Sequence, residues 1–459
     1  MPRLTLGQRL KRARLAAGLT QESLGKPELT KGFISLLEHD RAKPSVATLV
    51  RLAARLGQPV SHFLDAEETV SEKFLAVLAS RGRSELSRRQ FEAARSVFAE
   101  LGDLARACRS EAMQMHAELG LGEAELGLRQ FDAARRRLGA ALAAGRAAED
   151  ALVECRALHG LAAVELHLDH FPQAMALNKE ALGILPRLGG AEPLLAGEIS
   201  LDLGTVLGRM GHVDEAVEAY TQARQLFEGA SRPERVGEAL MGLGNVLSTG
   251  GDLESALGLY ERARALFEQH EDLQAAAHAR TSLGMLLMQT GRPQDAVEHL
   301  RAGLAITQRL EDAVGECRTL TDLARCYVMC GDRQLAAEYA ARAIARSRDV
   351  GQPDEEARTR IVLGVLAAER GDLPAAEQEM LAAAQRCRRS GMMPELVTIY
   401  HALGRLAGRQ GQYKEATAYH EQAFQALRAM KSTDVVAALH LTDLVGVGAE
   451  VALGHLPSG

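Results

Sequence analysis

The sequence predicts an all-α protein, and three observations support this fold class. Hydrophobic residues make up 47% of the 459 residues, but aromatic residues only 4%, and Trp is absent. A core of Ala, Leu and Val suits helices that lie close together. The 13 prolines and 43 glycines are few for an all-β chain of this length, and β-branched residues do not alternate with polar ones over any long stretch. Finally, a pattern of small residues returns at a fixed spacing, which is typical of helical repeats.

The charge of the chain is unevenly distributed. The formal net charge is −6. Residues 1–64 contain 11 Lys and Arg against 4 Asp and Glu, a net charge of +7, which leaves −13 for the remaining residues. A basic N-terminal region on an acidic chain predicts that this region alone contacts a polyanion.

The N-terminal region is predicted to form five short helices, because residues that begin and end helices recur along it. Thr5, Thr20 and Thr30 each precede a helical stretch as N-cap, and Gly18 ends the first stretch. Pro59 precedes the last one. The expected helices are LGQRLKRARLAAG (6–18), QESLG (21–25), KGFISLLEHD (31–40), VATLVRLAARLG (46–57) and VSHFL (60–64).

The second and third of these helices are joined by a short turn, and the third places Phe33, Leu36 and Leu37 at spacings that favour burial. With this arrangement, the region resembles the helix-turn-helix domain of the lambda-repressor/Cro-like (XRE) family. The segments that carry the resemblance are GLTQ (18–21), ISLLE (34–38), KPS (43–45) and LAARLG (52–57).

The resemblance implies that the region binds double-stranded DNA with its third helix in the major groove, and that the protein acts as a homodimer on a palindromic operator. It also implies that Arg14 and Glu38 form an internal ion pair between the first and third helices, which is a structural role. Lys31 is the best candidate to reach guanine acceptors, whereas Gln21 and Thr30 are placed for phosphate contacts at helix N-termini. The DNA-binding residues implied by the resemblance are Gln21, Thr30, Lys31, Gly32, Ser35, Arg41 and Lys43.

The rest of the chain contains an internal repeat of 40 residues. The pattern L-G-x6-G-x4-A-x3-Y-x2-A begins at Leu203 and again at Leu243. Four looser copies follow at the same spacing and three weaker ones precede it, which makes nine. We expect Gly204 and Ala216 to let two antiparallel helices touch, Gly211 to end a helix in the left-handed conformation, and Asp252 and its equivalents Asp332 and Asp372 to cap the next helix.

This repeat resembles the tetratricopeptide repeat, which implies a right-handed α-solenoid whose inner surface is lined by the first helix of each pair. An Asn side chain there can pair with a peptide backbone, and clustered Arg side chains can hold a carboxylate. The alternative is that these side chains are satisfied by neighbours within the array. Counting along the repeat gives the candidate peptide-binding residues Thr205, Arg209, Asn245, Thr249, Arg318, Arg325, Arg358, Arg405 and Arg409.

The domain organisation follows from these segments. We expect a helix-turn-helix domain over residues 1–64, a connecting helix over 65–74, a repeat array over 75–435, and a capping helix and tail over 436–459. The sequence shows neither a signal peptide nor an apolar run of membrane-spanning length, which predicts a cytoplasmic protein. The six cysteines form no CxxC pair; Cys326 and Cys330 share a helix face without a His pair nearby, so no metal or cofactor is expected.

A helix-turn-helix region followed by such repeats is similar to the peptide-responsive regulators of the quorum-sensing RRNPP group. The leading hypothesis is therefore a bacterial transcriptional regulator whose repeat groove binds a peptide or protein segment that modulates operator binding. The alternative is a scaffold for protein interactions that the N-terminal region localises to DNA. An enzyme is not expected, because nucleotide-binding, metalloprotease and serine-hydrolase motifs were not found.

Overall fold

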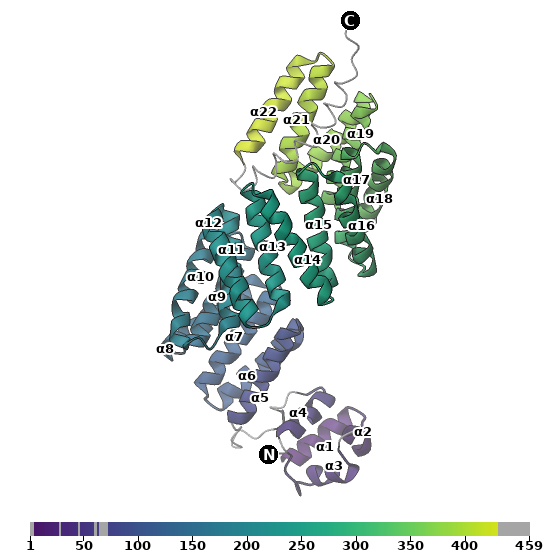
Figure 1. Cartoon of the computed structure of the whole chain (residues 1–459). Helices are drawn as coiled ribbons and strands as arrows, with labels where there is room; N and C mark the ends of the chain where they lie inside the picture. The colour runs from purple at the N-terminus through teal and green to yellow at the C-terminus, as the bar shows by residue number, and fades with distance from the viewer. Residues whose placement is uncertain (1–3, 27–28, 45, 59–61, 64–71, 430–459) are drawn as a thin grey trace. The chain divides into compact units, whose positions relative to one another are not determined.

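The computed structural model describes residues 4–26, 29–44, 46–58, 62–63 and 72–429, and every regular element in these segments is a helix (Figure 1). The all-α fold is therefore confirmed for the described part of the chain. The chain divides into two compact units, residues 1–192 and residues 193–459. Each unit is described by itself below.

The first unit begins with four short helices, which we call the head. They are α1 (Leu6–Ala16), α2 (Gln21–Gly25), α3 (Lys31–Glu38) and α4 (Val46–Arg55).

The predicted N-caps of the head are confirmed. Thr5, Thr20 and Thr30 each accept a hydrogen bond from a backbone N–H in the first turn of α1, α2 and α3. Helix α1 packs on α3, and α2 packs on both α3 and α4. Of the predicted fifth helix, only His62 and Phe63 lie in the described residues, and Phe63 is fully buried.

The described part of the first unit contains six further helices and a short 3-10 helix. They are α5 (Glu72–Ser87), α6 (Phe91–Ala107), α7 (Glu111–Gly127), α8 (Phe131–Ala147), α9 (Ala151–His167), α10 (Phe171–Ile184) and η2 (Leu185–Leu188). Most of the predicted connecting helix, 65–71, and the predicted capping helix and tail lie outside the described residues.

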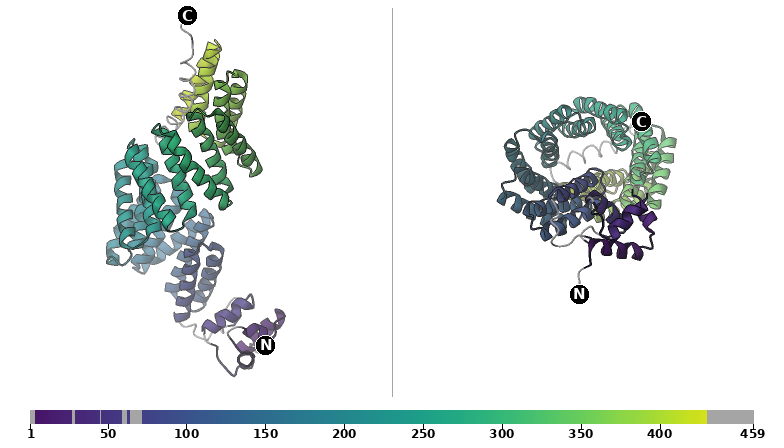
Figure 2. Two further views of the ribbon diagram at one scale, coloured as in Figure 1. Left: turned by 45° about the vertical axis from the view of Figure 1, so that its right-hand side comes forward. Right: turned by 90° about the horizontal axis from the view of Figure 1, so that it is seen from below.

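The second unit is a regular succession of antiparallel helix pairs, and Figure 2 shows these pairs following one another around a curve. The helices are α11 (Pro193–Met210), α12 (Val213–Gly229), α13 (Pro233–Thr249), α14 (Leu253–Gln269), α15 (Leu273–Gln289), α16 (Pro293–Arg309), α17 (Ala313–Met329), α18 (Arg333–Asp349), α19 (Pro353–Glu369), α20 (Leu373–Ser390), α21 (Met393–Arg409) and α22 (Tyr413–Arg428).

Helices α5 to α22 form nine pairs within the described residues, as the repeat count predicts. In the second unit the first helices of successive pairs begin 40 residues apart, at Pro193, Pro233 and onward to Met393. The predicted turn chemistry is confirmed: Gly211 and Gly251 have φ angles of +81° and +91°, and Asp252 accepts a hydrogen bond from the N–H of Ser255.

The strict spacing is interrupted between the two units. Helix α9 begins at Ala151 and α11 at Pro193, so this step is two residues longer than the later ones. The extra length is taken up by η2 and by Gly189 and Gly190, which have φ angles of +61° and +78°. The 42-residue step between α9 and α11 therefore has a local structural cause.

The first helices of the second unit lie on the inside of the curve. Among the first helices of the second unit, contacts across successive pairs join α11 to α13, α15 to α17, α17 to α19 and α19 to α21, and they are most extensive between α17 and α19. The close packing partners of the even-numbered helices described in this unit are odd-numbered helices. Helices on the inner side of a curved stack come closer to one another than those on the outer side. We call the surface formed by α11, α13, α15, α17, α19 and α21 the inner face.

Candidate functional sites

One side of α3 lies exposed on the surface of the head. Lys31 and Gly32 are exposed, and Ser35 is half-buried on the same side. Leu36 was predicted to be buried, and this is wrong: 44% of its surface is exposed. The reason is that the buried stripe of α3 runs through Ile34, Leu37 and Glu38, so Leu36 lies one position off the core and joins the exposed side.

The remaining predicted DNA-binding residues surround this surface. Arg41 and Lys43, just after α3, are exposed. The Thr30 hydroxyl accepts a hydrogen bond of 3.2 Å from the N–H of Phe33, so it fixes the first turn of α3. The Gln21 side-chain Nε2 donates to Glu38 Oε2 at 2.7 Å. Gln21 therefore has a structural contact inside the head that the sequence did not indicate.

A buried ion pair joins the first and third helices of the head, as predicted. Arg14 and Glu38 are only 7% and 3% exposed. Arg14 donates from Nε to Glu38 Oε1 at 2.5 Å and from Nη2 to Oε2 at 3.0 Å, and its Nη1 donates to the carbonyl of Leu19 at 2.8 Å. Burial alone would raise the pKa of Glu38, but the hydrogen bonds from Arg14 and Gln21 hold this pKa below its ordinary value.

Asp40 is a structural residue that the sequence reasoning missed. Its carboxylate accepts the Gly7 N–H at 2.8 Å and the Thr5 hydroxyl at 2.5 Å, so it ties the end of α3 to the start of α1. Asp40 has a φ of +56°, a conformation that Asp tolerates better than most residues. A Cβ on Gly7 would lie 2.4 Å from the carbonyl oxygen of Leu37, which shows how closely α1 and α3 approach. An Asp directly after a helix was the available signal.

The inner face of the second unit contains a large cavity, which we call the amide cavity. Its volume is about 570 Å³, and it lies along α11 and α13 and reaches α15. Thr205, Arg209, Asn245 and Thr249, all predicted from the repeat register, line it together with His278. The structure therefore brings four of the predicted residues into one concave surface.

Two tyrosines fix the polar side chains of the amide cavity. The Tyr260 hydroxyl donates to Asn245 Oδ1 at 2.6 Å. The side-chain oxygen of Asn245 is therefore satisfied within the array, which was the alternative to a peptide contact. Burial raises the pKa of Tyr260, which keeps this hydroxyl protonated as a donor. The Tyr220 hydroxyl and the Thr205 hydroxyl are 3.0 Å apart. Because Thr205 also donates to the carbonyl of Leu201, Tyr220 is the donor in this pair.

The tyrosine ring at the repeat motif occupies a socket made by two glycines. A Cβ on Gly204 would lie 2.8 Å from the Tyr220 ring, and a Cβ on Gly242 would lie 2.2 Å from it. We expected Gly204 to let two helix backbones touch, but its nearest neighbour is this ring. The glycines of α11 and α13 thus make room for an aromatic side chain of α12 that reaches the cavity.

A second cavity, which we call the ionic cavity, lies farther along the inner face. Its volume is about 140 Å³, and its lining comes from the first helices α15, α17, α19 and α21. Arg318, Arg325 and Arg358, all predicted, line it. Arg358 donates from Nη1 to Glu355 at 2.6 Å and from Nε to Glu395 at 2.9 Å. Arg325 lies 3.3 Å from Asp322, so two of the three arginines are paired with carboxylates of the array.

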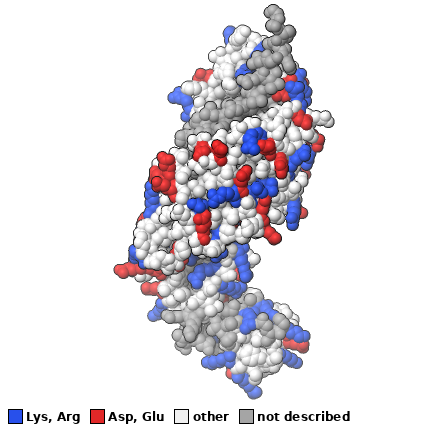
Figure 3. Space-filling model, viewed as in Figure 1, with Lys and Arg blue, Asp and Glu red and all other residues white. Residues whose placement is uncertain are grey.

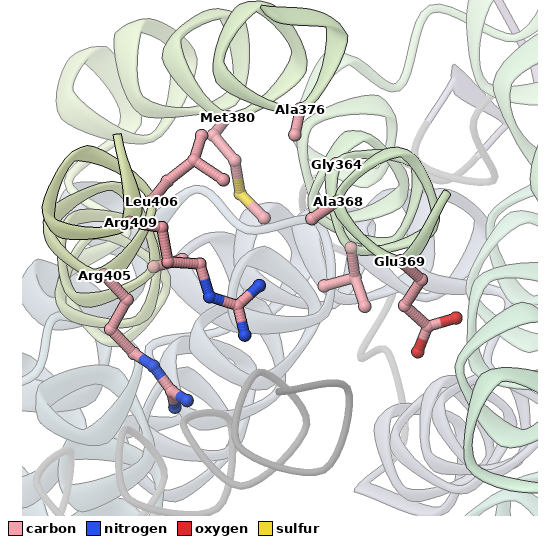
Figure 4. A pocket seen from close by; sticks show the side chains of 10 residues that line it. Gly364, Ala368, Glu369, Ala376, Met380, Arg405, Leu406 and Arg409 are labelled. Carbon is pink, nitrogen blue, oxygen red and sulfur yellow. The ribbon is translucent and has the colours of Figure 1, made fainter. Parts of the chain in front are cut away.

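The remaining predicted arginines, Arg405 and Arg409, line a smaller pocket of about 50 Å³ between α19, α20 and α21. Figure 4 shows both side chains extending from α21 on the same side of this pocket, with Met380 deeper inside. Glu369, on the opposite wall, pairs with Arg333 at 3.0 Å. Figure 3 shows that Lys and Arg are mixed with Asp and Glu over the visible face of the array, which agrees with the many ion pairs of this region.

The described residues offer no metal site. They contain no group of three or more His, Cys, Asp or Glu side chains arranged to hold a metal ion. The cysteines described are free thiols, and burial raises the pKa of Cys326 to about 12, so this thiol stays protonated at neutral pH. Among the helices that the structure describes, none is both long and apolar enough to cross a membrane.

Comparison with protein families identifies the repeat. Models described as tetratricopeptide repeat match residues 196–269, 274–349 and 396–430. The chain therefore contains tetratricopeptide repeats, as its 40-residue pattern predicted.

Solved structures with a similar fold come from the regulators that the sequence resembles. The chain matches apo RapI with a TM-score of 0.67 at 12% identity, over 78% of this chain and 98% of RapI. It matches the apo form of the quorum sensor NprR from B. thuringiensis with a TM-score of 0.62 at 11% identity, over 78% of this chain and 99% of NprR. Both belong to the RRNPP group, so the predicted similarity is confirmed, and at these identities it is a similarity of fold.

The N-terminal region is similar to a phage repressor. It is 34% identical over 90 residues to the immunity repressor protein of Bacillus phage phi105. The matched segment covers 19% of this chain and 62% of the repressor, which is less than two thirds of that protein.

Proposed function

We propose that this protein is a DNA-binding transcriptional regulator, and that a peptide or extended protein segment bound on its inner face changes its affinity for operator DNA. One observation carries the proposal: the same chain presents an exposed α3 surface in a basic head and a polar cavity of about 570 Å³ on a tetratricopeptide array. The similarity of the head to a phage repressor and of the array to a quorum sensor supports both halves.

The head side of the proposal rests on charge and exposure. Lys31 on α3 and Arg41 just after it are exposed, and residues 1–64 carry a net charge of +7. Such a surface attracts DNA phosphates, and a side chain in the major groove then reads base edges. A homodimer would place two α3 helices about 34–36 Å apart on a palindromic site, as related motifs do.

The array side rests on the shape and polarity of the amide cavity. Asn245 is exposed into the cavity, and Tyr260 orients its amide by binding the oxygen. An oriented amide can pair with the backbone of an extended peptide whatever its side chains are. Binding there alters DNA affinity only as far as the ligand prefers one arrangement of the array over another.

The first experiment tests DNA binding. The full chain selects its site from a random duplex pool, and fluorescence anisotropy then measures affinity for this site at several salt concentrations. We expect Arg41→Ala to weaken binding to all sequences and to reduce the salt slope by about one unit. We expect Lys31→Ala to relax base preference at one position, by about 1–3 kcal/mol of lost discrimination.

The matched control for these variants is Arg88→Ala, which removes an exposed positive charge from the end of α5. This variant should bind the selected site like the wild-type protein. If Lys31→Ala and Arg41→Ala behave like the control, the α3 surface is not the DNA-binding surface.

The second experiment tests regulation. Peptides selected on the full chain from a random heptapeptide pool are added to the protein–DNA complex, and the change in anisotropy is recorded. We expect a bound peptide to shift DNA affinity and Asn245→Leu to abolish the shift, whereas Gln385→Leu, which removes an exposed amide from α20, should preserve it. Peptides that bind and leave DNA affinity unchanged would instead support the scaffold function.

A further inference from the structure

The carboxylates of the ionic cavity are buried more deeply than its arginines. Asp322, Glu355 and Glu395 are 5%, 6% and 7% exposed, and all three line the cavity. Arg325 pairs with Asp322, and Arg358 pairs with both glutamates. Arg318 also lines the cavity; it is exposed, and its charge lowers the pKa of Asp322. The cavity therefore holds three buried carboxylates opposite three arginines that are each partly or fully exposed, Arg358 over 42% of its side chain.

Two carboxylate oxygens in this cluster lack a partner. Arg358 contacts Oε1 of Glu355 and Oε1 of Glu395, and Arg325 lies nearest to Oδ1 of Asp322. Within the part of the chain that the structure describes, Asp322 Oδ2 and Glu355 Oε2 are buried without any hydrogen-bond partner. Arg325 Nε is a buried donor without a partner among the same residues, so two acceptors stand against one donor. Leaving charged acceptors buried and unbonded is unfavourable, so the cluster remains short of a donor.

The titration behaviour of Asp322 agrees with this geometry. Burial raises the pKa of Asp322 above its ordinary value and Glu355 raises it further, although Arg325, Arg318 and Arg358 lower it. A donor that arrives next to Asp322 Oδ2 would reverse this effect.

We propose that the ionic cavity is a binding subsite for a cationic group, a lysine or arginine side chain or an amino-terminal ammonium, which donates hydrogen bonds to Asp322 Oδ2 and Glu355 Oε2. The volume of about 140 Å³ equals roughly five water molecules at about 30 Å³ each, which suits one side-chain head rather than a whole peptide. Met285, Ile361 and Val362 also line the cavity and suit the methylene stem of such a side chain.

The subsite specifies the ligand of the proposed function. That the cation arrives on a peptide rests on that function, whereas the affinity of the cavity for a cation does not. The arginines of this cavity were predicted to hold a carboxylate, but the contacts of Arg325 and Arg358 with Asp322, Glu355 and Glu395 favour the opposite charge on the ligand.

The test uses small probes and the full chain. Isothermal titration calorimetry compares Nα-acetyl-lysine amide, Nα-acetyl-arginine amide and the neutral Nα-acetyl-norleucine amide. We expect the cationic probes to bind with dissociation constants on the order of 1 mM, and the norleucine probe to bind about tenfold more weakly or not at all. Alanine amide carries its positive charge on the free amino group alone, so its binding shows whether the cavity accepts an amino terminus as well as a cationic side chain.

Variants then place the binding in the cavity. Asp322→Asn combined with Glu355→Gln should weaken the cationic probes by about tenfold or more. The control pair Asp214→Asn with Glu254→Gln removes two exposed carboxylates from α12 and α14 and should leave binding unchanged. Asp322→Asn alone serves as a second, milder variant, and circular dichroism verifies the fold of each.

Several results would overturn the subsite. One is that the cationic probes bind no more tightly than the norleucine probe. Another is that the control pair of substitutions weakens binding as much as the cavity pair does. The third is that Nα-acetyl-glutamate amide binds more tightly than the cationic probes. A positive result in calorimetry combined with no effect of any peptide on DNA binding would refute the proposed regulation and leave the subsite standing.

Discussion

The head and the array each contain a buried ionic cluster, and the two clusters differ in how completely they are bonded. In the head, Glu38 receives hydrogen bonds at both oxygens, from Arg14 and Gln21. In the array, Asp322 and Glu355 each keep one oxygen without a partner among the residues that the structure describes. The pKa of Glu38 is lowered and the pKa of Asp322 is raised, so the two buried carboxyl groups have pKa shifts of opposite sign. A completed cluster stabilises a fold, whereas an incomplete one has capacity left for a ligand.

The largest effect is expected when the completed cluster is broken. Glu38→Gln removes the charge and places an amide N–H₂ against the donors of Arg14. Because this leaves a buried guanidinium unpaired, we expect a loss of about 3–5 kcal/mol in the opening free energy of α1 and α3. Native-state hydrogen exchange read by mass spectrometry measures this on the full chain.

The matched control is Glu22→Gln, which removes an exposed carboxylate from α2 that pairs with Lys26. Its effect should stay within about 0.5 kcal/mol. If both variants behave alike, the Arg14–Glu38 pair does not hold the head together.

A smaller effect of the same sign is expected from mild acid, because near the lowered pKa of Glu38 only part of the molecules carry the protonated side chain. The folded state lowers the pKa of Glu38, so the folded head binds fewer protons than the unfolded one. The stabilisation is present above the ordinary glutamate pKa of 4.5 and is lost as the pH falls through the lowered value. Hydrogen exchange of α1 and α3 between pH 6 and pH 3, corrected for intrinsic rates, should show this loss in the wild-type protein and a flatter profile in Glu38→Gln.

The smallest effect is expected from the same chemical change in the incomplete cluster. Asp322→Asn removes a charge that the cavity compensates poorly, so the opening free energy of α17 should change by less than about 1 kcal/mol, and towards greater stability. Since the pKa of Asp322 is raised, the folded wild-type protein loses stability as the pH rises through that pKa, and the variant should not. Exchange at pH 7 measures the difference. A loss as large as that of Glu38→Gln would remove the distinction between the two clusters.

Local features of the fold followed from the sequence because their causes are local. Thr30 and Asp252 cap helices through their own side chains, and Gly211 adopts a positive φ that other residues disfavour. The repeat register also placed Thr205 and Asn245 on one cavity, because a strict period fixes which side of each helix faces inward.

Contacts between helices were harder to predict, because they depend on packing. Arg358 and Glu395 are 37 residues apart in the chain, and only the approach of α19 to α21 brings them within 2.9 Å. Leu36 was misplaced for a similar reason: a short amphipathic helix allows more than one phase, and the neighbours of α3 decide it. The sequence could not predict that one oxygen of Asp322 and one of Glu355 lack a hydrogen-bond partner among the described residues, because this depends on the position of each guanidinium group.

The tyrosine socket limits how the amide cavity can change shape. The Tyr220 ring lies between Gly204 of α11 and Gly242 of α13, and its hydroxyl reaches the cavity wall at Thr205. An aromatic ring cannot be compressed, so it acts as a spacer that keeps these two helices from closing on a ligand. We expect a bound molecule to rotate one helix pair relative to the next about this ring. Small rotations at successive pairs would then add up along the stack.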